Sequence, residues 1–310
     1  MADAGKTANP GGHAGSGPEV DEVTGYATTG HEWDGIRELN RPLPRWWLWT
    51  FYATIVFAIG YVVLYPGIPL IRGGTDGVLG YSTRATVEGE MALAREAQAG
   101  RLDQIANLPI EEIKANADLD RFAIAGGRSA FLVNCIQCHG TGAAGSKGYP
   151  NLNDDDWLWG GTLADIYATI AYGIRSDHPD THYSEMPSFD GMLTQAQMVA
   201  VANYVLSLSG KANDAALVSE GAALYNEPSN CVSCHGEGGI GDRTLGAPAL
   251  NDAIALRAAT VDELVSQMQA PKHGVMPAWS GRLSDTVVKQ LALYVYSLGG
   301  GEAAQEAAMQ

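Results

Sequence analysis

A repeated Cys-x-x-Cys-His motif is the feature that most constrains how this 310-residue chain can fold. The motif reads CIQCH at 135–139 and CVSCH at 231–235, and all four cysteines of the chain lie in these two copies. The same order of parts surrounds each copy: an amphipathic helix, the motif, a Gly-rich loop, a Pro-x-Leu step, further helices, a Met-Pro pair and a final helix. The repeat predicts two homologous domains, at 121–210 and 215–300.

The final helix of each repeat indicates a mainly helical fold. In both, a Ser or Thr that follows a leucine is placed to cap the helix, and apolar residues then recur at three- and four-residue spacing. Neither repeat shows a convincing alternation of apolar and polar residues of the kind that strands require. We therefore expect both domains to be mostly α-helical.

The cysteines permit four chemistries. Two-residue disulfide loops are unusual staples, and a thioredoxin-like dithiol would need strands and a parallel sheet. Zinc needs four ligands at close range, whereas the two cysteine pairs are 96 residues apart. A covalent c-type haem uses every residue of the motif, because the thiols form thioethers and the adjacent histidine binds iron. The sequence thus predicts two haems, attached through Cys135 and Cys138 with His139 as ligand, and through Cys231 and Cys234 with His235 as ligand.

The sixth iron ligand is expected to be a methionine. Met186 and Met276 each lie in a Met-Pro pair at matching places in the repeat, and a Met-closed iron is an electron carrier. If each repeat is self-contained, Met186 serves the first haem and Met276 the second. Three histidines compete for this role, but no two of them occupy equivalent positions: His178, His182 and His273.

Two prolines are candidates for supporting the iron-binding histidines. Pro150 and Pro248 lie a short loop beyond each motif, where a backbone carbonyl could accept the other imidazole N–H. The alternative is that both are simple turn prolines.

A membrane helix is predicted at 45–66. The twenty residues Trp46–Tyr65 carry no charge, are long enough to cross the bilayer hydrocarbon, and have aromatic residues at both ends. A buried core helix or a signal peptide are the alternatives, but the former rarely stays uncharged for this length and the latter would be shorter and nearer Met1. Arginines just before the helix favour a cytoplasmic N-terminus.

The membrane helix divides the rest of the chain. Residues 1–44 are predicted to form a cytoplasmic tail, 67–120 a periplasmic helical linker, and 301–310 a C-terminal tail. Bacterial c-type haem attachment is completed outside the cytoplasm, which places both haem domains on the periplasmic side. The formal charge of −16 argues against nucleic acid as a partner. After Arg72 there are 28 acidic and 14 basic residues, a balance that suits a basic protein partner.

The whole arrangement resembles one family. The segment DGIRELNRPLPRWW at 34–47, followed by one anchor, a helical linker and two haem domains, is similar to the dihaem subunit III of cbb3-type cytochrome c oxidases. Some members have a second membrane helix nearer the N-terminus, whereas this sequence shows one. The resemblance covers residues 30–300 and implies two tandem class I cytochrome c-like domains on a single-pass protein of the bacterial inner membrane, in contact with lipid.

The resemblance also implies a role and partners. Electrons from a soluble or membrane-bound cytochrome c would pass through the two haems to a monohaem subunit and on to the catalytic haem–copper subunit. This chain has no intramembrane His cluster for haem b or copper, so it would be an electron-transfer subunit without its own oxygen-reducing site. Two other functions compete: a free-standing membrane-anchored dihaem shuttle, and a dihaem peroxidase, which the symmetric Met-Pro pairs disfavour.

The resemblance changes the expected ligand pairing. In proteins that this chain resembles, the axial methionine is exchanged between domains, so His139 would pair with Met276 and His235 with Met186. Sequence order does not decide between the two schemes, because both use the same four residues.

Overall fold

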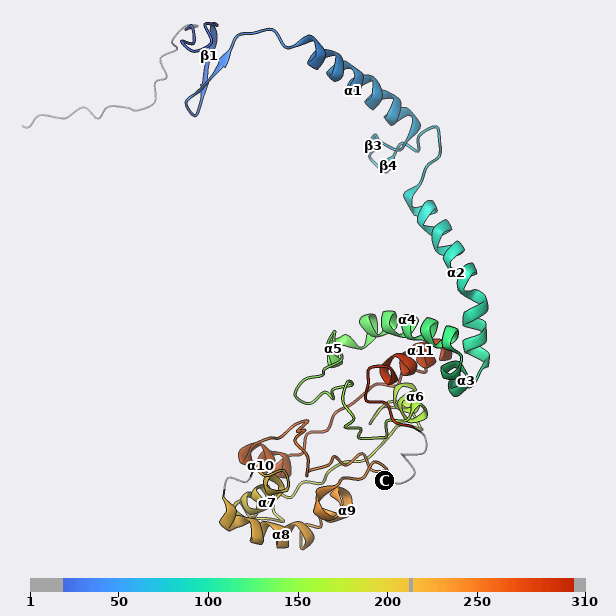
Figure 1. The fold of residues 1–310 in the computed structure, drawn as a ribbon, viewed down its shortest axis with the longest axis vertical. Helices are drawn as coiled ribbons and strands as arrows, with labels where there is room; N and C mark the ends of the chain where they lie inside the picture. Colours follow the sequence, from blue (N-terminus) through green and yellow to red (C-terminus); the bar gives the residue numbers. More distant parts are fainter. Residues whose placement is uncertain (1–18, 212–213, 304–310) are drawn as a thin grey trace, which may run out of the picture. The chain divides into compact units, whose positions relative to one another are not determined.

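The computed structural model describes residues 19–211 and 214–303, and these are mainly helical (Figure 1). The chain divides between Leu93 and Ala94 into two compact units. The first holds the apolar helix, and the second holds both Cys-x-x-Cys-His motifs.

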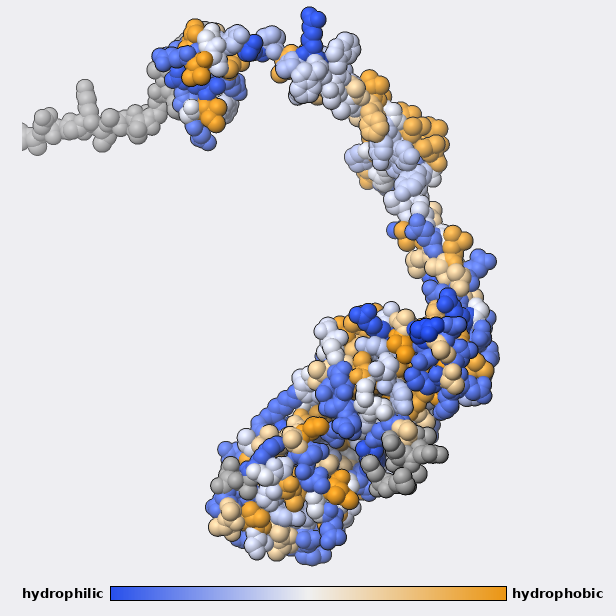
Figure 2. Space-filling model, viewed as in Figure 1, coloured by the Kyte–Doolittle hydropathy of each residue, from blue (hydrophilic) through white to orange (hydrophobic). Residues whose placement is uncertain are grey.

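The apolar helix of the first unit is α1 (Arg45–Leu64), which lies within the predicted range 45–66. It is long and apolar enough to cross a membrane, and none of its residues is buried within the protein. Its apolar side chains are accordingly open on the surface (Figure 2). An exposed apolar helix of this length is what a bilayer, rather than a protein core, would cover.

An antiparallel hairpin precedes α1 inside the predicted tail 1–44. Strands β1 (Thr28–Trp33) and β2 (Ile36–Leu39) are joined by Asp34 and Gly35, which both have positive φ, 48° and 84°. An Asp-Gly pair with this geometry is the two-residue turn that matches the twist of two strands. The predicted tail therefore contains a hairpin from 28 to 39; its residues 1–18 lie outside the described part of the chain.

A second, very short hairpin follows α1. It consists of β3 (Pro69–Leu70) and β4 (Gly73–Gly74). Beyond it, Val78 N–H donates to Val63 C=O at 2.9 Å and Leu79 N–H to Leu64 C=O at 3.1 Å. These bonds satisfy carbonyls that the last turn of a helix leaves without partners.

The predicted linker 67–120 is mostly helix. The long helix α2 (Thr83–Asn107) is followed by α3 (Ile110–Ala115), and α4 starts at Ala117, inside the predicted linker. The remaining elements of the second unit are α4 (Ala117–Asn134), α5 (Ile136–His139), α6 (Leu163–Tyr172), α7 (Gln195–Leu208), η1 (Ala215–Leu217), α8 (Val218–Asn226), α9 (Val232–His235), η2 (Glu237–Gly239), α10 (Val261–Gln269) and α11 (Asp285–Tyr296).

The second unit contains two hydrophobic cores. The first is formed by α3, α4, α6 and α11, and the second by α7, α8 and α10. In Figure 1, α11 accordingly lies beside α4, while α7 lies with α8 and α10. The final helix of each sequence repeat therefore packs in the core of the other repeat. The contiguous ranges 121–210 and 215–300 therefore each contribute to both cores.

Close helix crossings hold this exchange in place. A Cβ atom added to Gly127 of α4 would lie 2.0 Å from the carbonyl oxygen of Gln290 in α11. A Cβ added to Gly221 of α8 would lie 2.1 Å from the carbonyl oxygen of Ala200 in α7. Only glycine lets the two backbones approach so closely, and it does so at equivalent places in the two cores.

Aromatic pairs flank both crossings. Phe131 of α4 packs against Tyr294 of α11 with ring centroids 5.3 Å apart, and Tyr225 of α8 packs against Tyr204 of α7 at 5.2 Å. Tilted and edge-on pairs at this separation add to the stabilisation from burial alone. Each pair joins one residue from the first repeat to one from the second.

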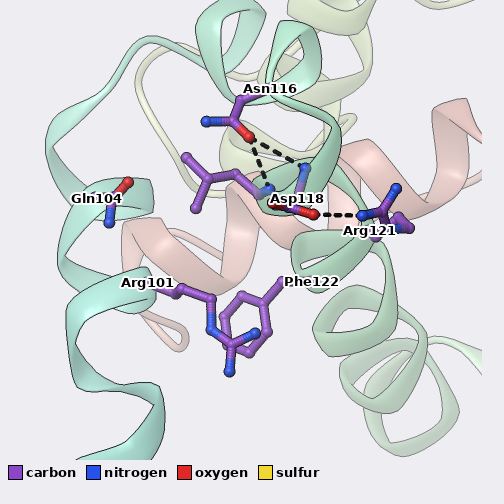
Figure 3. Close-up of a pocket in the computed structure, with 7 residues that line it drawn as sticks. Arg101, Gln104, Asn116, Asp118, Arg121 and Phe122 are labelled. Atoms are coloured by element: carbon purple, nitrogen blue, oxygen red, sulfur yellow. Dashed lines mark hydrogen bonds and ion pairs between the residues drawn. The ribbon is translucent and has the colours of Figure 1, made fainter.

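Residues of α2 and α4, and the turn before α4, line a shallow hollow on the surface (Figure 3). Side-chain contacts hold the chain in place there. The Asn116 side chain caps α4 by accepting from the N–H groups of Asp118 at 3.1 Å and Leu119 at 3.3 Å. The guanidinium of Arg101 lies over the ring of Phe122, 4.4 Å from its centroid. These contacts set the turn by which the chain enters the first core.

A lysine from α11 fixes the end of α2. Lys289 Nζ donates to the carbonyls of Ile105 at 3.3 Å, Ala106 at 3.1 Å and Leu108 at 3.1 Å. A cation at a helix C-terminus meets both the free carbonyls and the negative end of the helix dipole. The helix that leads into the second unit is thus tied to the last helix of the chain.

The start of the predicted C-terminal tail is also docked. Glu302 accepts from Gly161 N–H at 3.0 Å and forms an ion pair with Arg243 at 2.8 Å. The predicted tail 301–310 therefore includes one docked residue near its start, because the Glu302 carboxylate is partly buried between two loops. Residues 304–310 lie outside the described part of the chain.

The close crossings predict a selective effect of adding a methyl group. We expect Gly127→Ala and Gly221→Ala each to lower the free energy of unfolding by about 1–3 kcal/mol, because the new Cβ must displace backbone. Gly100→Ala in α2 is the matched control, since a Cβ there meets nothing within 4 Å. It should be neutral or stabilise by about 0.5–1 kcal/mol. Denaturant unfolding of the haem-loaded chain checks this, and equal effects of all three changes would contradict it.

Candidate haem sites

Each motif folds into a single helical turn. The N–H of His139 donates to Cys135 C=O at 3.0 Å, and the N–H of His235 donates to Cys231 C=O at 2.9 Å. Each turn ends at a glycine with φ near +75°, Gly140 and Gly236. One turn therefore gathers two thiols and an imidazole at both motifs.

Both histidines are oriented by a proline carbonyl. Nδ1 of His139 lies 3.1 Å from Pro150 O, and Nδ1 of His235 lies 3.0 Å from Pro248 O. A carbonyl oxygen can only accept, so Nδ1 is the donor in each pair. The Nε2 lone pair is then left free to bind a metal ion.

Burial fixes the protonation state of these groups. It lowers the pKa of His139 and of His235, although the hydrogen bond to the proline carbonyl partly opposes this shift. The neutral imidazole is the form that binds iron. Burial, followed by the nearby Cys138, raises the pKa of Cys135 to about 11, and burial also raises the pKa of Cys231. The two thiols are therefore neutral at pH 7.

The first site is an apolar cavity shared by both repeats. Cys135 and His139 come from the first repeat, and Met276 from the second lines the same cavity. Paired backbone hydrogen bonds between Met276 and Ile174, both 2.9 Å, hold that methionine there. Most of the other walls are aromatic or aliphatic side chains, among them Phe131, Trp157, Trp159, Ile170, Trp279 and Leu291.

The second site also combines the two repeats, with the motif from the second repeat and the methionine from the first. Met186, from the first repeat, packs against the second core together with Cys231. Its backbone N–H donates to Nε2 of His273 at 3.1 Å. The structure therefore brings Met276 to the cavity of His139 and Met186 to the core that carries the second motif.

The three competing histidines have other contacts. His182 stacks on Trp159 with ring centroids 4.5 Å apart, and its Nε2 lies 3.1 Å from the hydroxyl of Thr169. His178 stacks on Tyr172 at 4.9 Å. His273 receives the N–H of Met186, as described above. Each imidazole thus has a packing or hydrogen-bonding role of its own, and none of the three is among the residues that line the cavity of His139, although both partners of His182 do line it.

The residues present fit a covalently held haem. The cavity offers the Cys135 thiol, a neutral imidazole with a free Nε2 and a thioether, and its walls suit a flat apolar macrocycle; the Cys138 thiol of the same helical turn is exposed. Across the described ranges, no three His, Cys, Asp or Glu side chains gather as they would around a zinc ion. The arrangement therefore favours haem among the four chemistries open to the cysteines.

Trp159 is a residue of this region that the sequence did not point to. It lines the first cavity, and a Cβ added to Gly246 would lie 2.2 Å from its ring. Gly246 comes two residues before Pro248, the partner of His235. One indole therefore connects the cavity of the first motif to the loop that orients the histidine of the second. The stretch WLW at 157–159 was a visible aromatic cluster, but its position between the two cores depends on the exchange of helices.

Asp156 is a second such residue. It lines the first cavity, and burial raises the pKa of its carboxyl group to about 6. Asp252 and Asp154 add to this shift, whereas Arg243 opposes it. A run of three aspartates in sequence suggests a solvated surface. The partial burial of Asp156 is therefore a consequence of the tertiary fold.

Comparison with known families defines the chain as a c-type cytochrome subunit. The family described as cytochrome c oxidase, cbb3-type, subunit III matches residues 122–205 and again 216–295. The N-terminal domain of cytochrome oxidase-cbb3, FixP, matches residues 25–72.

Curated relatives cover nearly the whole chain. A cbb3-type cytochrome c oxidase subunit FixP of Rhizobium meliloti is 56% identical over 284 residues, 91% of this chain and 98% of the relative. A subunit CcoP of Cereibacter sphaeroides is 50% identical over 281 residues, 89% and 95% of the two chains. The chain therefore belongs to the FixP/CcoP family of cbb3-type cytochrome c oxidase subunits, which confirms the resemblance noted in the sequence.

The shifted carboxyl group predicts a pH-dependent gain in stability. A raised pKa means that ionised Asp156 destabilises the folded state, and that this cost grows as the pH rises from about 4 through 6. We expect Asp156→Asn to increase the free energy of unfolding more at pH 7.5 than at pH 4.5. The adjacent Asp155→Asn, at an exposed position, is the control. Denaturant titrations at the two pH values measure the difference, and a pH-independent effect of Asp156→Asn would contradict it.

Proposed function

We propose that this chain is the electron-transfer subunit of a cbb3-type oxidase, accepting electrons from a cytochrome c and passing them towards a haem–copper oxygen-reducing subunit. The observation that carries this is the shared cavity of His139 and Met276 in a chain of the FixP/CcoP family. A methionine beside an oriented histidine supports electron transfer, because a closed iron leaves no position for substrate.

Two covalent haems are part of the proposal. Cys135 and Cys138 would hold the first, and Cys231 and Cys234 the second, in the single helical turns of α5 and α9. When bound, each haem supplies one-electron chemistry between ferrous and ferric iron. The protein contributes the neutral imidazole, the Pro150 carbonyl or its counterpart at Pro248, and an apolar wall that excludes water.

The axial ligands are proposed to be exchanged between repeats. His139 would pair with Met276, because both line one cavity. His235 would pair with Met186, because this methionine packs with Cys231 on the second core. The two cores, rather than the contiguous ranges 121–210 and 215–300, would then be the two cytochrome c units, and both would be of class I.

The placement in the membrane follows from α1. We propose that α1 anchors the chain in the bacterial inner membrane, with residues 1–44 cytoplasmic and the second unit periplasmic. The arginines that precede α1 support this orientation, as does the need to attach c-type haem outside the cytoplasm. The proposed partners are a monohaem cytochrome c subunit, the catalytic haem–copper subunit, a donor cytochrome c and lipid.

Purification of the native complex tests the function. Membranes should yield this chain together with haem b and copper, in addition to its own c-type haem, when it is isolated by a tag at its C-terminus. Recovery of the chain with c-type haem alone, without haem b or copper, would instead indicate the free-standing dihaem shuttle.

Replacing one methionine tests the exchanged ligands. We expect Met276→Ala to abolish the Met-type absorption of the haem attached through Cys135 and Cys138, and to open that iron to carbon monoxide. Met192→Ala is the control, because Met192 is exposed and lies outside both cores. Loss at the haem attached through Cys231 and Cys234 would restore the within-repeat pairing.

The acidic balance of the periplasmic part predicts a salt effect. A field of this sign would steer a basic cytochrome towards the chain, and salt would screen it. The second-order rate of reduction by a basic cytochrome c should fall by roughly tenfold between low and physiological ionic strength. Stopped-flow spectrophotometry at several salt concentrations checks this, and a flat profile would limit the acidity to a role in solubility.

A further inference from the structure

The two methionine-bearing segments meet each other between the cores. Residues 173–189 carry Met186 into the second core, and residues 270–279 carry Met276 into the first. Ile174 and Met276 exchange two backbone hydrogen bonds, and Met186 N–H donates to His273 at 3.1 Å. Neither segment belongs to a regular helix or sheet, so individual contacts such as these hold it in place.

Arg175 bonds to both segments at once. Its Nε donates to Gly274 C=O at 2.7 Å, and its Nη1 donates to Ser184 C=O at 2.6 Å. Gly274 lies two residues before Met276, and Ser184 lies two residues before Met186. A single guanidinium therefore binds, in each segment, the backbone carbonyl two residues before the methionine. Its backbone adopts a φ of 50°, which non-glycine residues rarely do.

The charge on Arg175 has no carboxylate partner at this junction. Among the described residues, no Asp or Glu oxygen lies within ion-pair distance of its nitrogens, although Glu185 attracts it from further away. Burial and the neighbouring Arg257 lower the pKa of Arg175. Placing two cations side by side is unfavourable. The favourable interactions of the Arg175 guanidinium are therefore its two hydrogen bonds to backbone carbonyls, and not an ion pair.

We propose that Arg175 is a shared positioning residue for both axial methionines, an inference that rests on the proposed methionine ligation. A planar guanidinium can donate in two fixed directions, so it can fix the approach of both segments. A lysine ammonium keeps the charge but lacks the rigid fork. The two haem sites would accordingly be linked through one side chain, and loosening it would release both methionines together.

The test uses the full-length, haem-loaded chain with Arg175→Lys. Hydrogen bonds from a charged donor are each worth about a factor of ten in an equilibrium constant. We therefore expect the ratio of Met-bound to Met-free iron to fall by roughly tenfold at both haems, seen as roughly tenfold faster carbon monoxide binding to the ferrous form and a weaker ferric Met-type absorption. Arg121→Lys, an exposed residue paired with Asp118, is the matched control and should leave both signals unchanged.

Two reference variants separate this inference from the proposed function. Met186→Ala and Met276→Ala should each open one haem to carbon monoxide; if neither does, the methionine ligation itself is wrong. If both do while Arg175→Lys leaves the rate of carbon monoxide binding unchanged at both haems, the ligation stands and the role of Arg175 is overturned. Loss at only one haem would also overturn the shared role. Should Arg175→Lys load no haem, Arg175→Gln, which keeps amide donors without the charge, supplies the same readings.

Discussion

The glycine-mediated crossing of α4 with α11 is the contact on which the second unit depends. It lets backbones approach so closely that Gly127 leaves no room for a Cβ atom beside Gln290, and the equivalent crossing of α7 with α8 uses Gly221 in the same way. Because each crossing joins helices from different repeats, the chain between them must pass from one core to the other. The two methionine-bearing segments are those passages. Helix packing therefore decides which methionine reaches which cavity.

Charge is distributed differently outside and inside this unit. The chain after Arg72 has twice as many acidic as basic residues, and such a balance favours encounter with a cationic partner. Between the cores, by contrast, Arg175 and Arg257 lie close to each other. Positive charge near an iron favours its ferrous over its ferric form, because oxidation adds a further positive charge. Under the proposed function, the acidic balance would serve association, whereas the two arginines would act on the haems.

Much of this arrangement was predictable, and the limits have physical causes. The uncharged stretch ending at Tyr65 predicted a helix because length and composition alone define a membrane span, and the motifs pointed to His139 and His235 because their chemistry is local. The hairpin was not predicted, although the Asp-Gly pair at 34–35 is typical of a two-residue hairpin turn. Trp159, Asp156 and Arg175 gave no signal, since their roles depend on neighbours about 90 residues or more away.

The sequence by itself determined the chemistry of the sites, the repeat and the apolar helix. Residue type and short spacing are sufficient to set what a Cys-x-x-Cys-His turn, a nearby proline carbonyl and a Met-Pro pair can do. Only the tertiary structure decided that Met276 lies with His139 and that one guanidinium reaches both segments. Two similar repeats offer nearly the same apolar faces to each other as to themselves, so the choice between self-contained and exchanged packing is made by long-range contacts that no local pattern encodes.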